Sequence, residues 1–307
     1  MIFYVLLLLI PVSLVLEYVV HAPPIWVFGI ALLAIIPLAE FIRRATENLA
    51  RVAGSAIGGL LNITFGNIAE LIIALFVLRA GQVDVVKAQI TGSIVGNSLL
   101  GLGLAIVIGS WGRARQVFTR ERAGLLGSLM IISVIGLLVP AIFDYTERGV
   151  YAQADPHLLD EKVSLAASVV LILVYLANLI YSMVTHRDVF AIREPEEEKG
   201  AAPPWPWFKS VGVLVGATAF IAWEAELISG ALESTAETLG LSMFFLGVTV
   251  LAIIGNIAEY ISAVYFARKD RMAMVMTITV GSTVQVALFV APVLVLVSHF
   301  MGKPMDL

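Results

Sequence analysis

Two glutamates in this chain, Glu70 and Glu259, occupy the same local sequence. The stretches 66–70 and 255–259 both read Gly-Asn-Ile-Ala-Glu, and the offset between them is 259 − 70 = 189 residues. Each motif lies inside a long apolar run, where an acidic residue at the centre of a membrane helix costs about 2.5–3.5 kcal/mol on insertion scales. A chain that accepts this cost twice, in the same setting, most simply uses the two carboxylates to bind a cation or a proton inside the membrane.

The spacing within each motif favours a site built from oxygen atoms. Asn and Glu are three residues apart, so on a helix they share a face, and the glycine permits a local break that would free backbone carbonyls. Ca²⁺ takes about 6–8 oxygen ligands in flexible geometry. We therefore predict Glu70 and Glu259 as the metal ligands. The predicted cation- and proton-binding residues around them are Asn67, Asn256, Ser93, Asn97, Ser282, Gln285 and Gln89. Each polar neighbour taken singly could instead make a hydrogen bond between helices.

Two carboxylates at one site would also couple a metal ion to protons. Without the metal, desolvation and mutual repulsion favour protonation of at least one of the pair. A divalent cation favours the ionised pair and expels the proton. Competition for one site is the physical requirement for exchange.

The composition predicts an all-α, polytopic membrane protein. Of 307 residues, 60% are hydrophobic and only 14% are charged, whereas soluble domains carry about a quarter charged residues. Apolar runs of about 20 residues recur, which is the length that crosses a bilayer as a helix. The alternating pattern of a membrane β-barrel does not occur, and without cysteine there are no disulfides or thiolate metal sites. The predicted spans are 2–20, 24–42, 53–78, 83–110, 123–143, 163–184, 208–232, 240–266 and 272–300.

Charged loops predict the orientation of these spans. Basic residues follow the second, fourth and eighth spans, namely Arg43, Arg44, Arg51, Arg113, Arg115, Arg120, Arg122, Arg268, Lys269 and Arg271. The acidic loops, 144–161 and 233–237, fall on the opposite side by parity. Because cytoplasmic loops are enriched in Lys and Arg, we predict an integral, multi-pass protein with a cytoplasmic N-terminus.

The two halves of the chain form a repeat of opposite orientation. Gly92-Ser93 and Gly281-Ser282 keep the offset of 281 − 92 = 189, and Ala39-Glu40-Phe41-Ile42 matches Ala225-Glu226-Leu227-Ile228 at 226 − 40 = 186. Inverted repeats are typical of secondary transporters with a site at the membrane midplane. The predicted divisions are an extra N-terminal helix (1–23), a first transport repeat (24–185), an acidic, Pro-rich cytoplasmic linker (186–207) and a second transport repeat (208–307). Symmetry predicts two further helices after the second repeat.

Further acidic residues flank the predicted site. Glu40 and Glu47 are seven residues apart on the second span, and Glu226 and Glu233 are their counterparts on the seventh, with Glu224 beside them. We predict that these residues line vestibules that concentrate cations or that they take part in gating. The alternative is a set of interfacial charges that happens to repeat.

At these motifs the chain resembles the cation/proton exchanger family, the CAX-type calcium/proton antiporters of the calcium/cation antiporter superfamily. The first motif continues with Leu71-Ile72-Ile73-Ala74-Leu75-Phe76, the second is followed by Ser262-Ala263, and the Gly-Ser elements match as well. The resemblance covers nearly the whole chain. It implies a sodium/calcium-exchanger type of inverted repeat with an extra N-terminal helix, about nine of eleven helices in this chain, and Glu70 and Glu259 as the shared Ca²⁺ and H⁺ site. Tyr260 departs from the histidine of many relatives.

The predicted function is therefore secondary active exchange of Ca²⁺ for H⁺ by alternating access. The nearest alternative is a sodium-coupled exchanger of the same fold. Such relatives have serine and proline near the glutamate, whereas this chain has Asn67 and Ala69, which argues against this alternative. A cation channel is less favoured, since an internal inverted repeat indicates one site with alternating access. No Ser/His or metal–histidine set indicates an enzyme. We predict no cofactor and no nucleic-acid partner, with Ca²⁺ as the transported substrate, other divalent cations as possible cargo, and the oligomeric state left open.

Overall fold

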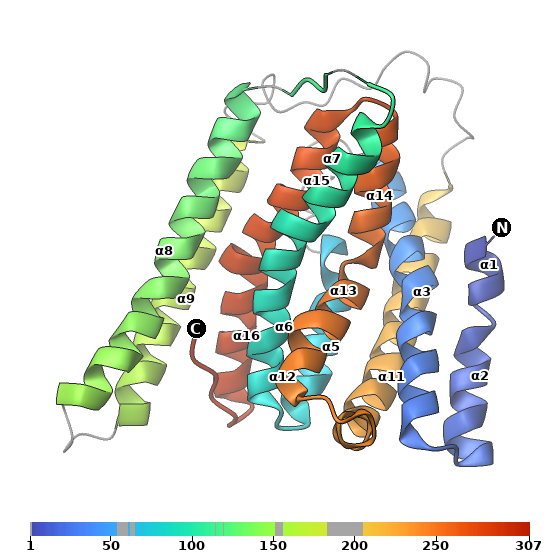
Figure 1. Cartoon of the computed structure of the whole chain (residues 1–307), viewed down its shortest axis with the longest axis horizontal. Helices are drawn as coiled ribbons and strands as arrows, with labels where there is room; N and C mark the ends of the chain where they lie inside the picture. Colours follow the sequence, from blue (N-terminus) through green and yellow to red (C-terminus); the bar gives the residue numbers. More distant parts are fainter. Residues whose placement is uncertain are drawn as a thin grey trace.

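The structure is a computed structural model that describes residues 2–53, 61, 65–113, 115–118, 120–150, 156–182 and 205–307. Every regular element in these ranges is a helix (Figure 1). The first half contains α1 (Ile2–Leu6), α2 (Leu9–Val15), η1 (Leu16–Val20), α3 (Pro24–Ala53), α5 (Ile68–Arg79), α6 (Val83–Val95), η2 (Gly96–Gly101), α7 (Leu102–Ser110), α8 (Arg120–Val150) and α9 (Pro156–Ile180). The second half contains α11 (Trp207–Leu239), α12 (Met243–Phe245), η5 (Leu246–Leu251), α13 (Ala252–Gly255), α14 (Ile257–Arg268), α15 (Met272–Gln285), η6 (Val286–Val290) and α16 (Ala291–Phe300). The segments labelled η are π-helical turns.

The helices confirm the predicted membrane class. Seven helices in the described ranges are long and apolar enough to cross a bilayer, and an eighth span is formed if the pair Met243–Gly255 and Ile257–Arg268, bent by 53°, counts as one. Of the predicted span 53–78, residues 54–60 and 62–64 lie outside the described residues, as does linker segment 186–204. The predicted count of nine spans therefore stays a prediction.

Several helices extend beyond the predicted spans. α3 continues past 42 to Ala53, α8 past 143 to Val150 and α11 past 232 to Leu239, and α9 begins at Pro156 and not at 163. On α3 the charges that limited the prediction pair with one another along the helix: Arg43 and Arg44 both contact Glu40, at i,i+3 and i,i+4 spacing. Such pairs let charged residues continue a helix rather than end it.

The corresponding helices of the two halves pack against each other in opposite directions. α3 rises from the lower to the upper end of the bundle in Figure 1, α11 descends beside it, and the two pack along their length. Both helices bury small side chains in the same core cluster, among them Ala31 and Ala34 on α3 and Ala225 on α11. Small residues let helix backbones approach closely where no hydrophobic force draws them together. The antiparallel pair is the arrangement that an inverted repeat predicts.

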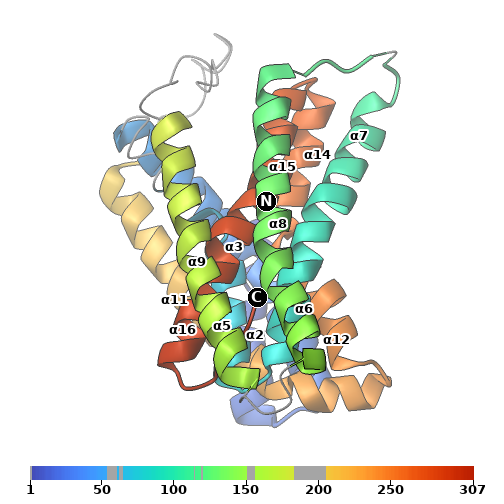
Figure 2. The same cartoon turned by 90° about the vertical axis from the view of Figure 1, so that its left-hand side faces the viewer.

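The rest of the bundle frames this pair. α6 packs against η5 and α14 against α7, so each half of the chain interleaves with the other. α8 and α9 stand at one side, visible at the left of Figure 1 and in front in Figure 2, and pack on α15, η6 and α16. The outer face of α8 exposes Ile131, Ile135, Leu138 and Val139. An apolar face of this kind suits contact with lipid.

The basic ends of the helices gather at one end of the bundle. The C-terminal ends of α3, α7 and α14 and the N-terminal end of α8 all lie at the upper end in Figure 1. This is the grouping that loop parity predicts. That this end is cytoplasmic remains a prediction from the distribution of Lys and Arg.

Candidate functional site

Each repeated motif forms a break between two helical segments. The backbone leaves helical geometry at Asn67 (φ −107°, ψ 24°) and again at Asn256 (φ −105°, ψ 10°). α5 and α14 then begin at the next residue, so that Glu70 and Glu259 both lie in a first helical turn. The positive end of the helix dipole stabilises negative charge at this position. The near-identical dihedral angles show that the repeat extends from sequence to backbone geometry.

The glycines of the motifs act differently from the sequence interpretation. The break lies one residue after each glycine, and neither Gly66 nor Gly255 has a positive φ. Instead, Gly255 packs against the other motif: a Cβ added there would lie 3.5 Å from Cβ of Glu70. A Cβ on Gly66 would lie 3.5 Å from Oε1 of Gln285. Both glycines therefore lie where the two halves are in contact, Gly255 against Glu70 and Gly66 against Gln285.

The motif asparagines join the two halves by hydrogen bonds. Asn256 Nδ2 donates to Ser93 Oγ at 2.9 Å, and Asn97 Nδ2 donates to Asn256 Oδ1 at 2.8 Å. The same pattern recurs at the first motif, where Asn67 pairs with the second half. Ser282 Oγ donates to Asn67 Oδ1, and Asn67 Nδ2 donates to Gln285 Oε1, both at 2.9 Å. Each asparagine is thus held by a residue pair from the opposite repeat.

Glu70 is sealed inside this arrangement. Its side chain is 1% exposed, and both carboxylate oxygens lack a hydrogen-bond partner among the described residues. Ser93 and Asn256 are polar side chains beside it, and Gln89 Nε2 donates to its backbone oxygen at 3.2 Å. Oε1 of Gln89 and Oδ1 of Asn97 are also buried without a described donor. Buried oxygens without donors are costly, and a bound cation or proton would satisfy them.

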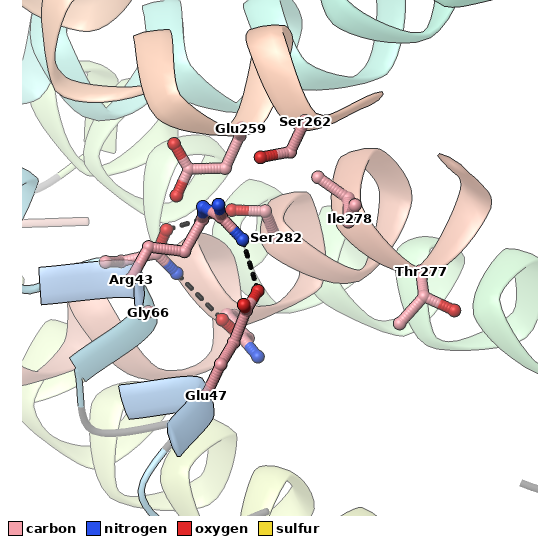
Figure 3. Close-up of a pocket in the computed structure, with 10 residues that line it drawn as sticks. Arg43, Glu47, Gly66, Glu259, Ser262, Thr277, Ile278 and Ser282 are labelled. Atoms are coloured by element: carbon pink, nitrogen blue, oxygen red, sulfur yellow. Dashed lines mark hydrogen bonds and ion pairs between the residues drawn. The ribbon is translucent and has the colours of Figure 1, made fainter. Parts of the chain in front are cut away.

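Glu259 faces a cavity instead. A cavity of about 110 Å³ is lined by Glu259, Ser262 and Ser282 on one side and by Arg43 and Glu47 of α3 on the other (Figure 3). Its lining includes Glu47, whose side chain is 42% exposed, and the exposed Thr277, so the cavity is open to the surface. Glu70 is not among the residues that line it. In this conformation, therefore, the cavity reaches Glu259 but not Glu70.

A smaller cavity lies next to the first and connects the two breaks. It is lined by Gly66 and Gly255 together with Arg43 and Glu259. Glu70, Arg43 and Glu40 all lie within electrostatic range of the Glu259 carboxylate. In the described part of the chain, His, Cys, Asp and Glu form no cluster of three or more that could hold a metal ion. A cation here would depend on the two motif carboxylates and on neutral oxygens.

Arg43 is a residue of the site that the sequence interpretation missed. Its guanidinium lies between the carboxylates of Glu259 and Glu47 in Figure 3. It donates to both oxygens of Glu40 at 2.9 Å and also to Glu47. Glu40, predicted as a vestibule carboxylate, is only 5% exposed and also accepts from Arg44 at 2.6 Å. The i,i+3 and i,i+4 spacing of these four residues was the available signal.

The acidic residues of α11 are placed in three different surroundings. Glu226 is exposed and pairs with Arg79 at 3.3 Å, and Glu233 is exposed. Glu224 is completely buried and accepts a hydrogen bond from Ser13 of α2 at 2.8 Å. None of the three lines either of the two cavities. Their vestibule or gating role stays a prediction.

Tyr260, which follows the second glutamate, fills a notch made by two glycines of η2. A Cβ on Gly96 would lie 2.5 Å from the Tyr260 hydroxyl oxygen, and one on Gly101 would lie 2.8 Å from the ring. The ring is 5% exposed. The two glycines therefore leave room for the ring of Tyr260 at the position where the sequence departs from histidine.

Comparison with known proteins agrees with this architecture. The model of the family described as sodium/calcium exchanger protein matches residues 23–184 and 209–306. The chain is 42% identical to a Ca²⁺/H⁺ antiporter of Aphanothece halophytica, over 100% of this chain and 84% of that protein. It is 39% identical to the Ca²⁺/H⁺ antiporter ChaA of Bacillus subtilis, over 97% and 83% of the two chains. The solved structure of native YfkE is similar with a TM-score of 0.82 at 34% identity, over 100% of this chain and 84% of that one.

Proposed function

The chain belongs to the sodium/calcium exchanger protein family, and on that premise we propose that it exchanges Ca²⁺ for H⁺ across a membrane. Relatives that align over 92% to 100% of this chain are named Ca²⁺/H⁺ antiporters. In the proposed mechanism Glu70 and Glu259 form one site that holds either Ca²⁺ or protons, and the site faces the two sides of the membrane in turn.

The observation that carries the proposal is the meeting of the two motifs. Gly255, four residues before Glu259, packs directly on Glu70, so the two carboxylates come from helix breaks that touch. Both oxygens of Glu70 and Oε2 of Glu259 are buried without a hydrogen bond of normal geometry, although the polar side chains of Ser93 and Asn256 lie beside Glu70. A structural role would leave these oxygens hydrogen-bonded, because unpaired buried polar atoms destabilise a protein. A bound Ca²⁺ ion or proton supplies positive charge to these oxygens and so removes the cost of burying them unpaired.

Exchange follows from charge balance at such a pair. Two ionised carboxylates in a water-poor site are neutralised by one Ca²⁺, whose oxygen ligands lie at about 2.3–2.6 Å. Protons neutralise the same groups by forming neutral carboxylic acids. Because the two ligands compete, arrival of Ca²⁺ releases protons and arrival of protons releases Ca²⁺. The unpaired oxygens of Gln89 and Asn97 are candidates to complete the Ca²⁺ ligand set.

Alternating access is supported by the one-sided opening of the site. The cavity reaches Glu259 from the end of the bundle where α3 and α14 end, while Glu70 is sealed. An inverted repeat contains the same elements in the opposite direction, so a movement that exchanges the conformations of the two halves would seal Glu259 and open Glu70. In this mechanism α3 and α11, which pack along each other, are the helices that move.

Sodium-coupled exchange is the second candidate, because the family takes its name from sodium/calcium exchangers. The test is ⁴⁵Ca²⁺ uptake into acid-loaded vesicles that contain the purified chain, with and without a sodium gradient. Antiport predicts uptake that requires the acid interior, is abolished by nigericin with K⁺ on both sides and does not respond to sodium. Uptake that follows sodium and ignores pH would refute proton exchange.

Variants of the motif glutamates complete the experiment. Glu70→Gln and Glu259→Gln each replace an ionisable oxygen by a neutral amide of the same size, and we expect uptake to fall to the level of protein-free vesicles. Glu237→Gln, an exposed substitution at the far end of α11, serves as the matched control. Full uptake by either motif variant would rule out the two-glutamate site.

A further inference from the structure

We propose that Arg43 is a tethered cation that competes with Ca²⁺ for Glu259, and so weakens Ca²⁺ binding from the side on which the cavity opens. The inference rests on the proposed function, since it assumes that Glu259 binds Ca²⁺. It adds a residue that lowers the affinity for Ca²⁺ when the site is open to one side of the membrane, and not when it is open to the other.

The position of Arg43 carries the inference. Its side chain lines both cavities, as does Glu259. The guanidinium lies between Glu259, deeper in the site, and Glu47, near the surface (Figure 3). A cation that reaches Glu259 through this cavity must pass a fixed positive charge. In such a confined space that charge is not screened as it would be in bulk water.

Neutralisation of Glu40 does not account for the presence of Arg43. Glu40 is also paired with Arg44 at 2.6 Å, so the buried carboxylate keeps a counterion if Arg43 is replaced. Glu40, Glu47 and Glu259 bring three carboxylates near Arg43, and of the two guanidinium groups that pair with Glu40 only that of Arg43 lines the cavity. The charge of Arg43 is thus available to offset Glu259 when no Ca²⁺ is bound.

Arg44 provides a matched control on the same helix. It pairs with the same Glu40 but lines neither cavity. Its guanidinium lies 5.7 Å from the centre of the Phe3 ring of α1, on the side of α3 toward the N-terminal helix. Replacing Arg43 or Arg44 therefore removes the same charge from the same ion-pair network, but only the first replacement removes it from the cavity.

At the position that corresponds to Arg43, the second half has a neutral residue. With the offset of 186 that relates Glu40 to Glu226, the counterpart of Arg43 is residue 43 + 186 = 229, which is Ser229. Its hydroxyl donates to the backbone oxygen of Glu226 at 3.0 Å. The tethered cation is thus a feature of one half, and any effect on Ca²⁺ affinity is one-sided.

The experiment is calorimetric titration of Ca²⁺ into the purified full chain in detergent at one fixed pH. We expect Arg43→Gln to lower the Kd for Ca²⁺ on the order of tenfold, since a unit charge is removed beside the site. Arg43→Lys, which keeps the charge, should stay within about threefold of the wild-type Kd, and Arg44→Gln within about twofold. If Arg43→Gln does not elute as a single species, Arg43→Met removes the charge with an apolar side chain instead.

The possible results separate the two proposals. A wild-type chain with no saturable Ca²⁺ binding would overturn the proposed function. If the wild type binds Ca²⁺ and the Arg43→Gln Kd is unchanged or higher, the tethered-cation role is wrong while the proposed function stands. An equal gain in Arg44→Gln would also refute it, because the effect would then come from net charge and not from the cavity.

Discussion

Among the described glycines, Gly92 has the shortest distance between an added Cβ and a neighbouring atom. A Cβ added at Gly92 would lie 2.1 Å from the backbone oxygen of Val248, 2.7 Å from its carbonyl carbon and 2.8 Å from Cβ of Ala252. Non-bonded heavy atoms settle at about 3.5 Å. Two of the three obstacles are backbone atoms, which cannot rotate away. In a Gly92→Ala variant α6 must therefore move from η5 by more than about 1 Å.

That movement would also break the hydrogen bonds next to it. Ser93 and Asn97 follow on the same helical run and bind Asn256 at 2.9 and 2.8 Å. An added 1 Å takes both pairs past about 3.5 Å, beyond hydrogen-bond range. Overpacking costs about 1–3 kcal/mol, and each lost hydrogen bond about 1 kcal/mol more. We expect Gly92→Ala to destabilise the folded protein by about 3 kcal/mol or more.

The assay is thermal unfolding of the purified chain in detergent, followed by the fraction that remains monodisperse. A loss of this size should lower Tm by at least about 5 °C. Gly103→Ala is the control on the same continuous helical run, because no described atom lies within 4 Å of a Cβ there. Gly247→Ala, whose Cβ would lie 2.7 Å from the Val85 backbone oxygen, tests the same contact from the opposite helix. A Gly92→Ala variant as stable as Gly103→Ala would refute the close contact between α6 and η5.

Two further substitutions test polar contacts elsewhere in the bundle. Asn256→Ala removes bonds to Ser93 and Asn97, so we expect a loss of about 2–4 kcal/mol, seen as a lower Tm, whereas Thr238→Ala at an exposed bond to the Ser234 backbone oxygen should change Tm little. Ser13→Ala leaves the buried Glu224 carboxylate without its described donor and should cost about 1–3 kcal/mol. The double variant Ser13→Ala/Glu224→Leu should recover most of that loss, and failure to recover would show that Glu224 has another essential contact.

Much of the fold is predictable from the sequence, because the signals are local or repeated. Apolar length predicts the spans, and the parity of the basic loops predicts which helix ends lie together. The repeated pentapeptide predicts that Asn67 and Asn256 have equivalent positions, which their backbone angles confirm. These predictions hold because a membrane helix must satisfy its own backbone hydrogen bonds, so helix and span follow from composition alone.

The details of the site were less accessible from the sequence. Glycine suggested where the helices break, but the breaks lie at the asparagines, where side chains from the opposite half hold the chain. The placement of Arg43 depends on how α3 packs against α14, and no local pattern specifies a contact between residues so far apart in sequence. The length of α3 was underestimated because charges were taken as a boundary, although their spacing allows them to neutralise each other along the helix.

The repeat is symmetric in its motifs but not in what surrounds them, and this difference bears on the direction of transport. A group that weakens Ca²⁺ binding in one access state shifts the Ca²⁺-loaded protein toward the other state by the same factor, because the two equilibria are linked. Arg43 faces the cavity in the conformation described here, whereas its counterpart is Ser229. If Arg43 weakens binding at Glu259, it favours turning the loaded site away from the end where the basic residues gather. With that end cytoplasmic, as loop parity predicts, the bias is toward export of Ca²⁺.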